Sequence, residues 1–425
     1  MAEALFISFV VLVILGVPIA VALGLAGVIA MVFFGNVPVM VAVQKVYSGV
    51  DSFTLMAIPF FILAGNIMSA GGVSGRLVDL ASAFLGRMTG GLALVSTAAC
   101  TFFGAISGSA PATTAAIGSI MIKPMVERGY SKVFAAATVA ASGTIGLLIP
   151  PSITAVIYGV IANVSIGKLF MGGIIPGLIM AVALMAVEYY ISKQRGYHGD
   201  EAVSAAKTLV AFKRSILALV MPLIILGGIY GGIFTPTEAA VVAVVYGLIV
   251  GIFVYKELTY SVAVKVFLDS AKSTAVIMYL VATAHIFSYI LASEQIPQKI
   301  TSAMLSISTE PIMILMLINL ALLIVGTFLD NAVAMVLLTP IFYPVIMSVG
   351  IDPVFFGVLM VLGLAIGQIT PPVGLCLFVA CNIGNVSIEA ISKEVIPWLI
   401  MLIAVLLMIT FMPGLVLWIP NAMMQ

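Results

Sequence analysis

The chain has 425 residues, of which 63% are hydrophobic and 8% charged, and its formal net charge is +1. An ordinary soluble domain carries about 25% charged residues, so this composition excludes a soluble globule. The few charges form neither a basic stripe nor a phosphate-cradling loop, which argues against nucleic acid or nucleotide partners. Apolar runs of about 20 residues, enough to cross a lipid bilayer, recur from end to end. The sequence therefore predicts an all-α, multi-pass membrane protein.

The first apolar segment, 5–34, follows Glu3 rather than a basic region and is too long for a cleaved signal, so we expect it in the mature protein. The break at Gly16-Val17-Pro18 leaves open one kinked span or two short ones, and with them the orientation of the N-terminus. Further spans are predicted at about 53–70, 133–163, 169–192, 215–234, 237–255, 273–293, 353–385 and 395–420. Three amphipathic connectors, 73–88, 202–214 and 256–272, are expected to be helices on the membrane surface, with plain loops as the alternative.

Residues 129–166 are similar to residues 350–388. The pair Pro150-Pro151 matches Pro371-Pro372, and the tetrapeptide Asn-Val-Ser-Ile occurs near the end of both segments. We therefore predict a first repeat at 1–192, a cytoplasmic surface segment and connecting span at 193–236, and a second repeat at 237–425. The connecting span would turn the second repeat upside down, and the concentration of Lys and Arg in the connectors of one side agrees with inverted repeats.

The proline pairs predict two broken helices, at about 133–163 and 353–385. A proline lacks its N–H and its ring collides with the carbonyl four residues back, so the carbonyls of Gly146 and Gly367 should be freed. Ile149 and Thr370 each precede a proline, and their carbonyls should also leave the helical ladder. In lipid such groups need protein, water or a bound cation as partners, although a plain kink is the alternative for each break.

A polar, glycine-rich segment precedes each break, at 103–114 and at 326–331. Each has apolar flanks of about half-membrane length, which predicts two re-entrant hairpins at about 91–127 and 311–347. Their tips would hold the candidate substrate-binding residues Ser109, Asp330 and Asn331. An acid at that depth is a functional candidate, but Asp330 could instead cap the second helix of its hairpin, and the two roles can coexist.

These segments resemble the large membrane subunit (M subunit, DctM-like) of the tripartite ATP-independent periplasmic (TRAP) transporters, over essentially the whole chain. The strings that carry the resemblance are Phe60–Gly65, Ser107–Thr113, Leu148–Ser152, Gly232–Ala240, Gly326–Asp330 and Gly367–Gly374.

The resemblance implies an ion-transporter fold of the elevator type, coupled to Na⁺, in the bacterial inner (cytoplasmic) membrane. It implies three partners: a small four-helix membrane subunit (Q-type), a periplasmic substrate-binding protein (P-type) and an anionic small molecule such as sialic acid or a C4-dicarboxylate. No small-subunit sequence precedes the first span, so we expect the Q-type subunit as a separate chain. It implies a carrier rather than an enzyme.

The resemblance also implies two sodium sites. The first maps to Ser107, Gly146, Ile149 and Pro151, and the second to Gly326, Gly367, Thr370 and Val373. The proline pairs by themselves predict free carbonyls at four of these positions, Gly146, Ile149, Gly367 and Thr370, and the other positions follow from the resemblance alone. Gly104 departs from the serine of many relatives, so a hydroxyl contact at that position is lost while a carbonyl contact survives.

Competing functions remain at this stage. A stand-alone sodium/dicarboxylate carrier would have a similar architecture, and an ion channel could use the same hairpins but needs a continuous pore. An intramembrane hydrolase needs a nucleophile with a base, or two acids, and Asp330 is the only acid expected at such a depth in a polar segment.

Overall fold

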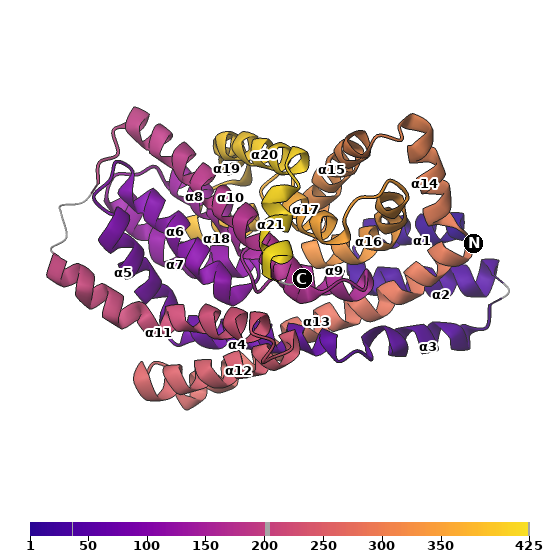
Figure 1. The fold of residues 1–425 in the computed structure, drawn as a ribbon, viewed down its shortest axis with the longest axis horizontal. Helices are drawn as coiled ribbons and strands as arrows, with labels where there is room; N and C mark the ends of the chain where they lie inside the picture. The colour runs from indigo at the N-terminus through magenta and orange to yellow at the C-terminus, as the bar shows by residue number, and fades with distance from the viewer. Residues whose placement is uncertain (36, 200–204, 424–425) are drawn as a thin grey trace.

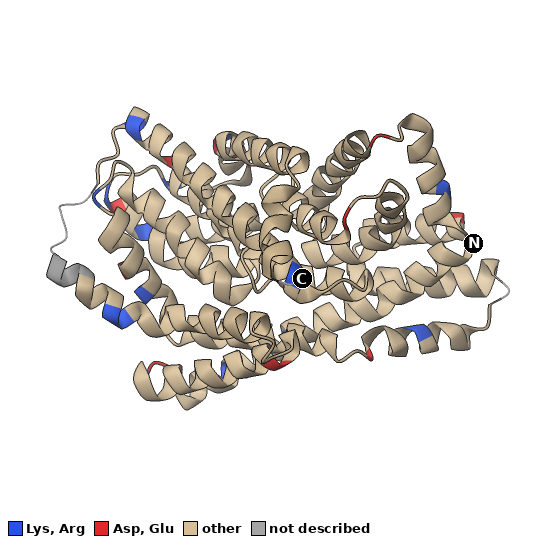
Figure 2. Ribbon diagram, viewed as in Figure 1, with Lys and Arg blue, Asp and Glu red and all other residues tan. Residues whose placement is uncertain are grey.

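The computed structural model describes residues 1–35, 37–199 and 205–423, and in these ranges all regular structure is helical. Within the same ranges, six helices are long and apolar enough to cross a membrane, or up to nine spans exist if each bent pair counts as one. Figure 2 shows the charged residues mostly at helix ends and in connectors. The prediction of an all-α polytopic membrane protein is confirmed.

The helices of the first half are α1 (Ala2–Ile14), α2 (Ile19–Phe34), α3 (Val39–Val50), α4 (Ala57–Ala70), α5 (Val73–Leu85), α6 (Gly91–Ser107), α7 (Ala110–Glu127), α8 (Lys132–Gly143), α9 (Ile153–Ile161) and α10 (Ile166–Arg195), with 3-10 turns at Thr54–Met56 and Thr144–Leu147. Those of the second half are α11 (Ala205–Tyr230), α12 (Pro236–Ile249), a π-helical turn at Val250–Val254, α13 (Tyr260–Ser293), α14 (Ile296–Ile307), α15 (Pro311–Phe328), α16 (Asn331–Ser348), α17 (Pro353–Gly367), α18 (Leu375–Gly384), α19 (Ile388–Glu394), α20 (Ile396–Phe411) and α21 (Gly414–Met423).

The N-terminal segment forms two short helices. Gly16 has φ +80°, a conformation that glycine adopts readily, and Pro18 precedes the first residue of α2. The helices α1 and α2 contact each other, and α2 packs against the long helix α13 (Figure 1). Gly24 allows this approach, because a Cβ there would lie 2.9 Å from Cγ2 of Thr283.

The two hairpins consist of α6 with α7 and α15 with α16. Gly108 ends α6 with φ +62°, and Ser109 is extended and begins α7. Pro111 lies in the first turn of α7, where its missing N–H costs nothing. In the second hairpin, Leu329 and Asp330 are both extended between α15 and α16.

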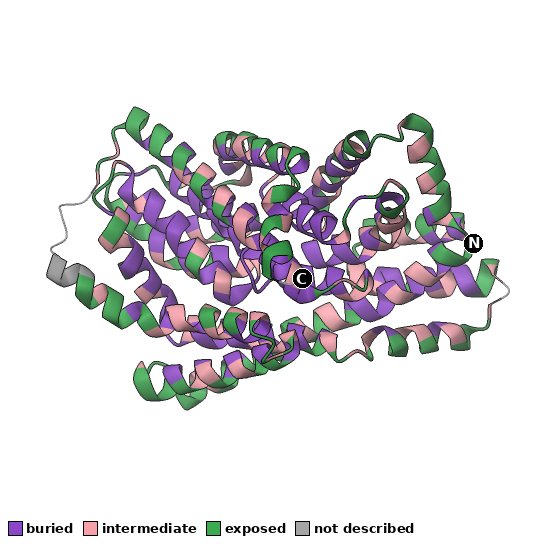
Figure 3. Cartoon of the chain, viewed as in Figure 1, coloured by how far each residue is buried: buried purple, intermediate pink, exposed green. Residues whose placement is uncertain are grey.

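Each broken helix has its break at a proline pair. The first consists of α8, a 3-10 turn and α9, and the second of α17 and α18. The peptide bonds within Pro150-Pro151 and Pro371-Pro372 are cis. The half-helix after each break contacts the opposite hairpin: α9 packs against α16, and α18 packs against α7 and α8 (Figure 1). The buried residues of both halves form one core (Figure 3).

Several expectations about the connectors and spans were wrong. Residues 260–293 form the single helix α13, so 256–272 is not a separate surface helix. Residues 205–214 likewise begin α11, and 202–204 lie outside the described residues. The span expected at 395–420 bends by 57° between α20 and α21. The connector at 73–88 does form a helix, α5, and its Leu77 is buried where α5 meets α6 and α11.

A buried tyrosine joins the two halves. The hydroxyl of Tyr158 on α9 donates a hydrogen bond of 2.7 Å to the Pro353 carbonyl at the start of α17. Its ring is fully buried against Gly357, where a Cβ would overlap the ring.

We expect Tyr158→Phe to lower the free energy of unfolding by about 1 kcal/mol, because one buried hydrogen bond is lost. Tyr158→Ala should cost about 3–5 kcal/mol, because it also leaves a cavity. Thermal unfolding in detergent measures both. Tyr190→Phe is the control, since Tyr190 is exposed. If Tyr158→Phe is as stable as the wild type, the hydrogen bond between α9 and α17 does not stabilise the fold.

Candidate ion and substrate site

Hydroxyl groups hold the tip of the first hairpin. Ser107 Oγ lies 2.7 Å from Thr113 Oγ1, and Thr113 Oγ1 donates to the Ser109 carbonyl at 2.8 Å. The Ser109 N–H is 3.4 Å from Ser107 Oγ. The end of α6 and the start of α7 are thus tied together by short side chains, and the tip presents oxygen atoms at a point where the helix ladder is interrupted.

This tip touches the first break directly. The Ile153 N–H donates to the Gly108 carbonyl at 3.3 Å, and the Pro151 carbonyl lies so close to Gly108 that a Cβ there would overlap it. A Cβ on Gly104 would lie 2.8 Å from the Cα of Gly146. Glycine at 104 therefore permits close backbone contact, which gives a structural reason for its presence in this chain.

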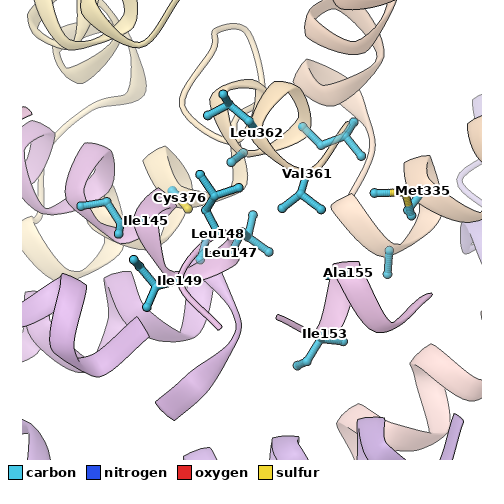
Figure 4. Packing of buried hydrophobic residues seen from close by; sticks show 14 of the residues in the cluster. Ile145, Leu147, Leu148, Ile149, Ile153, Ala155, Met335, Val361, Leu362 and Cys376 are labelled. Atoms are coloured by element: carbon cyan, nitrogen blue, oxygen red, sulfur yellow. The ribbon is translucent and has the colours of Figure 1, made fainter. Parts of the chain in front are cut away.

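The first break frees backbone carbonyls as expected. Among the described residues, no hydrogen bond reaches the carbonyl oxygen of Gly146 or of Ile149. The structure brings the Ser107 tip, Gly146 and Pro151 into one neighbourhood. The Ile149 side chain packs instead against Gly177 of α10, in the buried apolar region that Figure 4 shows around the break.

The second hairpin and break repeat this contact with one difference. A Cβ on Gly367 would lie 2.5 Å from the Cα of Gly326, and the Gly374 N–H donates to the Thr327 carbonyl at 3.4 Å. The Thr370 N–H, however, donates to the Gly367 carbonyl at 3.1 Å. The expectation of a free Gly367 carbonyl was therefore wrong, because a tighter i to i+3 turn replaces the bond that Pro371 removes.

Two other members of the predicted second site lie within this break. The Thr370 carbonyl accepts no hydrogen bond in the described chain, while its hydroxyl donates to the Ile366 carbonyl at 2.8 Å. Val373 precedes Gly374, which has φ +58° and begins α18. Both residues are thus in non-helical backbone beside the second hairpin.

Asp330 caps the second hairpin helix. Its Oδ1 accepts the Ala332 N–H at 2.9 Å at the start of α16. Asn331 is 3% exposed, and its Oδ1 accepts Nε2 of Gln368 at 3.1 Å. The capping role of Asp330 is therefore present.

A cavity of about 550 Å³ lies between the first hairpin and helices α4 and α13. Ser107 and Ser109 line it, whereas Asp330 and Asn331 do not, so the three predicted substrate residues are not all at one cavity. Asn66, Ser69 and Ser273 also line it, and none of them was predicted. Asn66 was detectable in principle, because it is an amide in an apolar helix, and its Nδ2 donates to Ser270 Oγ at 2.9 Å.

The donor atoms suit a hard monovalent cation. In the described ranges no three His, Cys, Asp or Glu residues form a metal-binding group. The available ligands are hydroxyl groups and unbonded carbonyl oxygens in broken helices, which is the donor set that transporters use for Na⁺. The residues present therefore fit the predicted ion.

Two helical hairpins, two broken helices and a polar cavity at the tip of the first hairpin are features of membrane transporters. Residues 6–415 match the family model described as "Tripartite ATP-independent periplasmic transporter, DctM component". The chain belongs to this family, and it is a TRAP transporter large permease.

The relatives carry different substrate names. The chain is 50% identical over 411 residues to the isethionate TRAP transporter permease protein DctMQ of Oleidesulfovibrio alaskensis, covering 96% of this chain and 65% of that protein. It is 42% identical over 399 residues to the C4-dicarboxylate large permease DctM of Pseudomonas aeruginosa (94% and 93% covered). It is 38% identical over 406 residues to the sialic acid large permease SiaM of Vibrio cholerae (96% and 95% covered).

The fold also has a solved counterpart. The crystal structure of the Alcanivorax borkumensis YdaH transporter superposes with a TM-score of 0.67 and covers 99% of both chains at 14% sequence identity. This likeness supports the fold class of inverted repeats with hairpins and broken helices, and it is an argument about the fold alone.

Substitutions at Asp330 separate capping from charge. Asn is as good an N-cap as Asp, so we expect Asp330→Asn to keep the thermal stability of the wild type and to lose most transport. Asp330→Ala should also lose about 0.5–2 kcal/mol of stability. The control is Asp352→Asn, because Asp352 caps α17 through the Val354 and Phe355 N–H groups at 2.8 and 2.9 Å. Wild-type uptake by Asp330→Asn would reduce Asp330 to a cap.

Proposed function

We propose that this protein is the membrane carrier of a sodium-coupled importer for a small organic acid, and that it works by an elevator movement in the bacterial inner membrane. The observation that carries the proposal is the repeated contact between a hairpin tip and a break with unbonded carbonyls. Such a carbonyl is costly in lipid, and a cation offsets that cost. Sodium binding would then organise the first hairpin tip, which lines the cavity.

The cavity supports a small polar substrate. Its lining includes Asn66, Ser69, Ser109 and Ser273 and contains no charged side chain. Hydroxyl and amide groups can donate hydrogen bonds to a carboxylate or sulfonate without a fixed counter-ion. The names of the relatives include an isethionate, a C4-dicarboxylate and a sialic acid transporter, all for small organic acids.

The family membership supports the partners. A large permease implies a small permease subunit and a periplasmic binding protein that delivers the substrate. We propose a small four-helix subunit as the membrane partner: relatives named as large permeases match this chain over 93–98% of their own lengths, whereas the isethionate permease DctMQ is matched over only 65% of its length. A stand-alone sodium/dicarboxylate carrier is the alternative, and it predicts uptake by this chain without either partner.

Sodium dependence tests the proposal directly. In proteoliposomes that contain the permease subunits, with the binding protein outside, we expect uptake to require an inward Na⁺ gradient and no ATP. Replacing Na⁺ by K⁺ at a fixed membrane voltage is the measurement. Undiminished uptake in K⁺ would reject sodium coupling.

The proline pairs test where sodium binds. Replacing Pro150 and Pro151 by alanine restores two N–H groups, which can occupy the carbonyls of Gly146 and Leu147. We expect the sodium affinity to fall by at least about tenfold, or about 1.4 kcal/mol, while thermal stability holds or rises. The same change at Pro371 and Pro372 should have a smaller effect, because the Gly367 carbonyl already accepts a hydrogen bond.

Sodium titration of both double variants, monitored by thermal shift, distinguishes these outcomes. Each variant is the control for the other, since both carry two Pro→Ala changes at matched positions. Unchanged sodium affinity in the first variant would mean that the freed carbonyls are not ligands.

A further inference from the structure

A fully buried carboxyl group lies outside the site described above. Glu188 on α10 is 0% exposed, as are Thr97 on α6 and Ser142 on α8, whose hydroxyls contact it. None of the ion pairs within the described residues includes Glu188. The facing titratable groups are thiols: Cys100 on α6 and, beyond it, Cys376 on α18. Among the described residues, no Lys or Arg forms an ion pair with Glu188 that would compensate a negative charge.

The oxygen atoms form a chain of close contacts. Glu188 Oε1 is in short contact with Thr97 Oγ1, which lies 2.6 Å from Ser142 Oγ, and Ser142 Oγ lies 2.7 Å from the Thr138 carbonyl oxygen. The contacts at 2.6 and 2.7 Å are typical of O–H···O hydrogen bonds, the contact between Thr97 and Glu188 is shorter than an ordinary one, and each of the three needs one proton between its two atoms. A longer contact of 3.2 Å between Ser142 Oγ and Glu188 Oε1 is not needed to connect the chain. The chain therefore needs three protons.

The hydroxyl groups supply only two of them. The Thr138 carbonyl can only accept, so Ser142 must donate to it, and Thr97 must then donate to Ser142. The contact between Thr97 and Glu188 consequently has no proton unless the carboxyl group carries it. If Glu188 were ionised, Thr97 could donate to it, but either the contact at 2.6 Å or the contact at 2.7 Å would place two oxygens together without a proton.

The other side of the carboxyl group agrees with a neutral acid. Among the described residues, Glu188 Oε2 has no hydrogen bond of good geometry, and the indole N–H of Trp398 on α20 lies close enough to donate only weakly to the group. A buried carboxylate with one unpartnered oxygen and no counter-ion would be far more costly than a protonated acid in the same place.

The second repeat has a neutral pair at the matching position. Thr97 and Glu188 are separated by 91 residues, and so are Asn319 and Thr410, whose side chains form a buried hydrogen bond of 2.9 Å. Asn319 follows Thr97, and Thr410 follows Glu188, by the same number of residues by which Asn385 follows Asn163 in the repeat. A neutral bond is thus sufficient to join these helices in one repeat, so the acid in the other repeat is an added feature.

We infer that Glu188 is a proton-binding site, and that its acid proton closes a hydrogen-bond chain that joins α10 to α6 of the first hairpin and to α8 of the first broken helix. The ligand is one proton, donated from Oε1 to Thr97. Separation of α6 from α10 would remove the acceptor and expose the acid to ionisation. The chain therefore links the proton occupancy of Glu188 to the packing of the hairpin that lines the cavity.

Infrared difference spectroscopy of the whole purified protein tests this inference. At neutral pH we expect Glu188→Gln to remove one carbonyl band of a protonated carboxylic acid, a band that shifts in D₂O. Thr97→Val keeps the carboxyl group but removes its acceptor, so the band should remain and move to higher frequency. Thr410→Val, the matched change in the second repeat, should leave the band unchanged.

The alternative gives a different spectrum. If Glu188→Gln removes a carboxylate band and no acid band, Glu188 is ionised and the inference is wrong. Should Glu188→Gln fail to fold, the Thr97→Val spectrum still decides, because an unchanged acid region would contradict the chain.

Discussion

A backbone carbonyl within a bilayer needs a partner, and this single constraint organises the centre of the protein. Prolines at 150–151 and 371–372 remove the N–H groups that would normally supply it. At the first break, carbonyls remain without hydrogen bonds beside a hydroxyl-lined hairpin tip, and at the second a tighter turn satisfies one of them. The two matched sites are therefore chemically unequal, although one sequence pattern generates both.

Close backbone contact makes this arrangement compact. Gly104 meets Gly146, and Gly326 meets Gly367, at distances where a Cβ would collide with backbone atoms. Backbone cannot rotate away as a side chain can, so a methyl group at either contact would separate a hairpin from its broken helix. Glycine thus brings the hydroxyl groups of the first hairpin tip close to the carbonyl oxygens of the first break.

The sequence was most informative where the controlling chemistry is local. Pro-Pro pairs and the Gly108-Ser109 tip act on their own backbone, so the breaks and both helical hairpins were predicted within a few residues. The extent of α13 was not, because 256–272 was interpreted as an amphipathic surface connector, whereas a stretch without Gly or Pro continues as helix. Asn66 and Glu188 were missed for another reason. A single polar residue in an apolar helix acquires its role from the neighbours that tertiary packing brings to it.

The asymmetry of the repeats bears on how such a carrier works. Two identical halves would have equal free energies of interaction with any one ligand. Here the first repeat has free carbonyls at its break, a cavity at its hairpin tip and an acid on α10, while the second has a satisfied Gly367 carbonyl, the Asp330 cap and the neutral Asn319–Thr410 pair. A conformational change is driven only by ligands that interact differently with the two states. Because these groups are concentrated around the first hairpin, a ligand bound there can alter the packing of that hairpin against α4, α8 and α10. The second repeat offers a ligand fewer such groups.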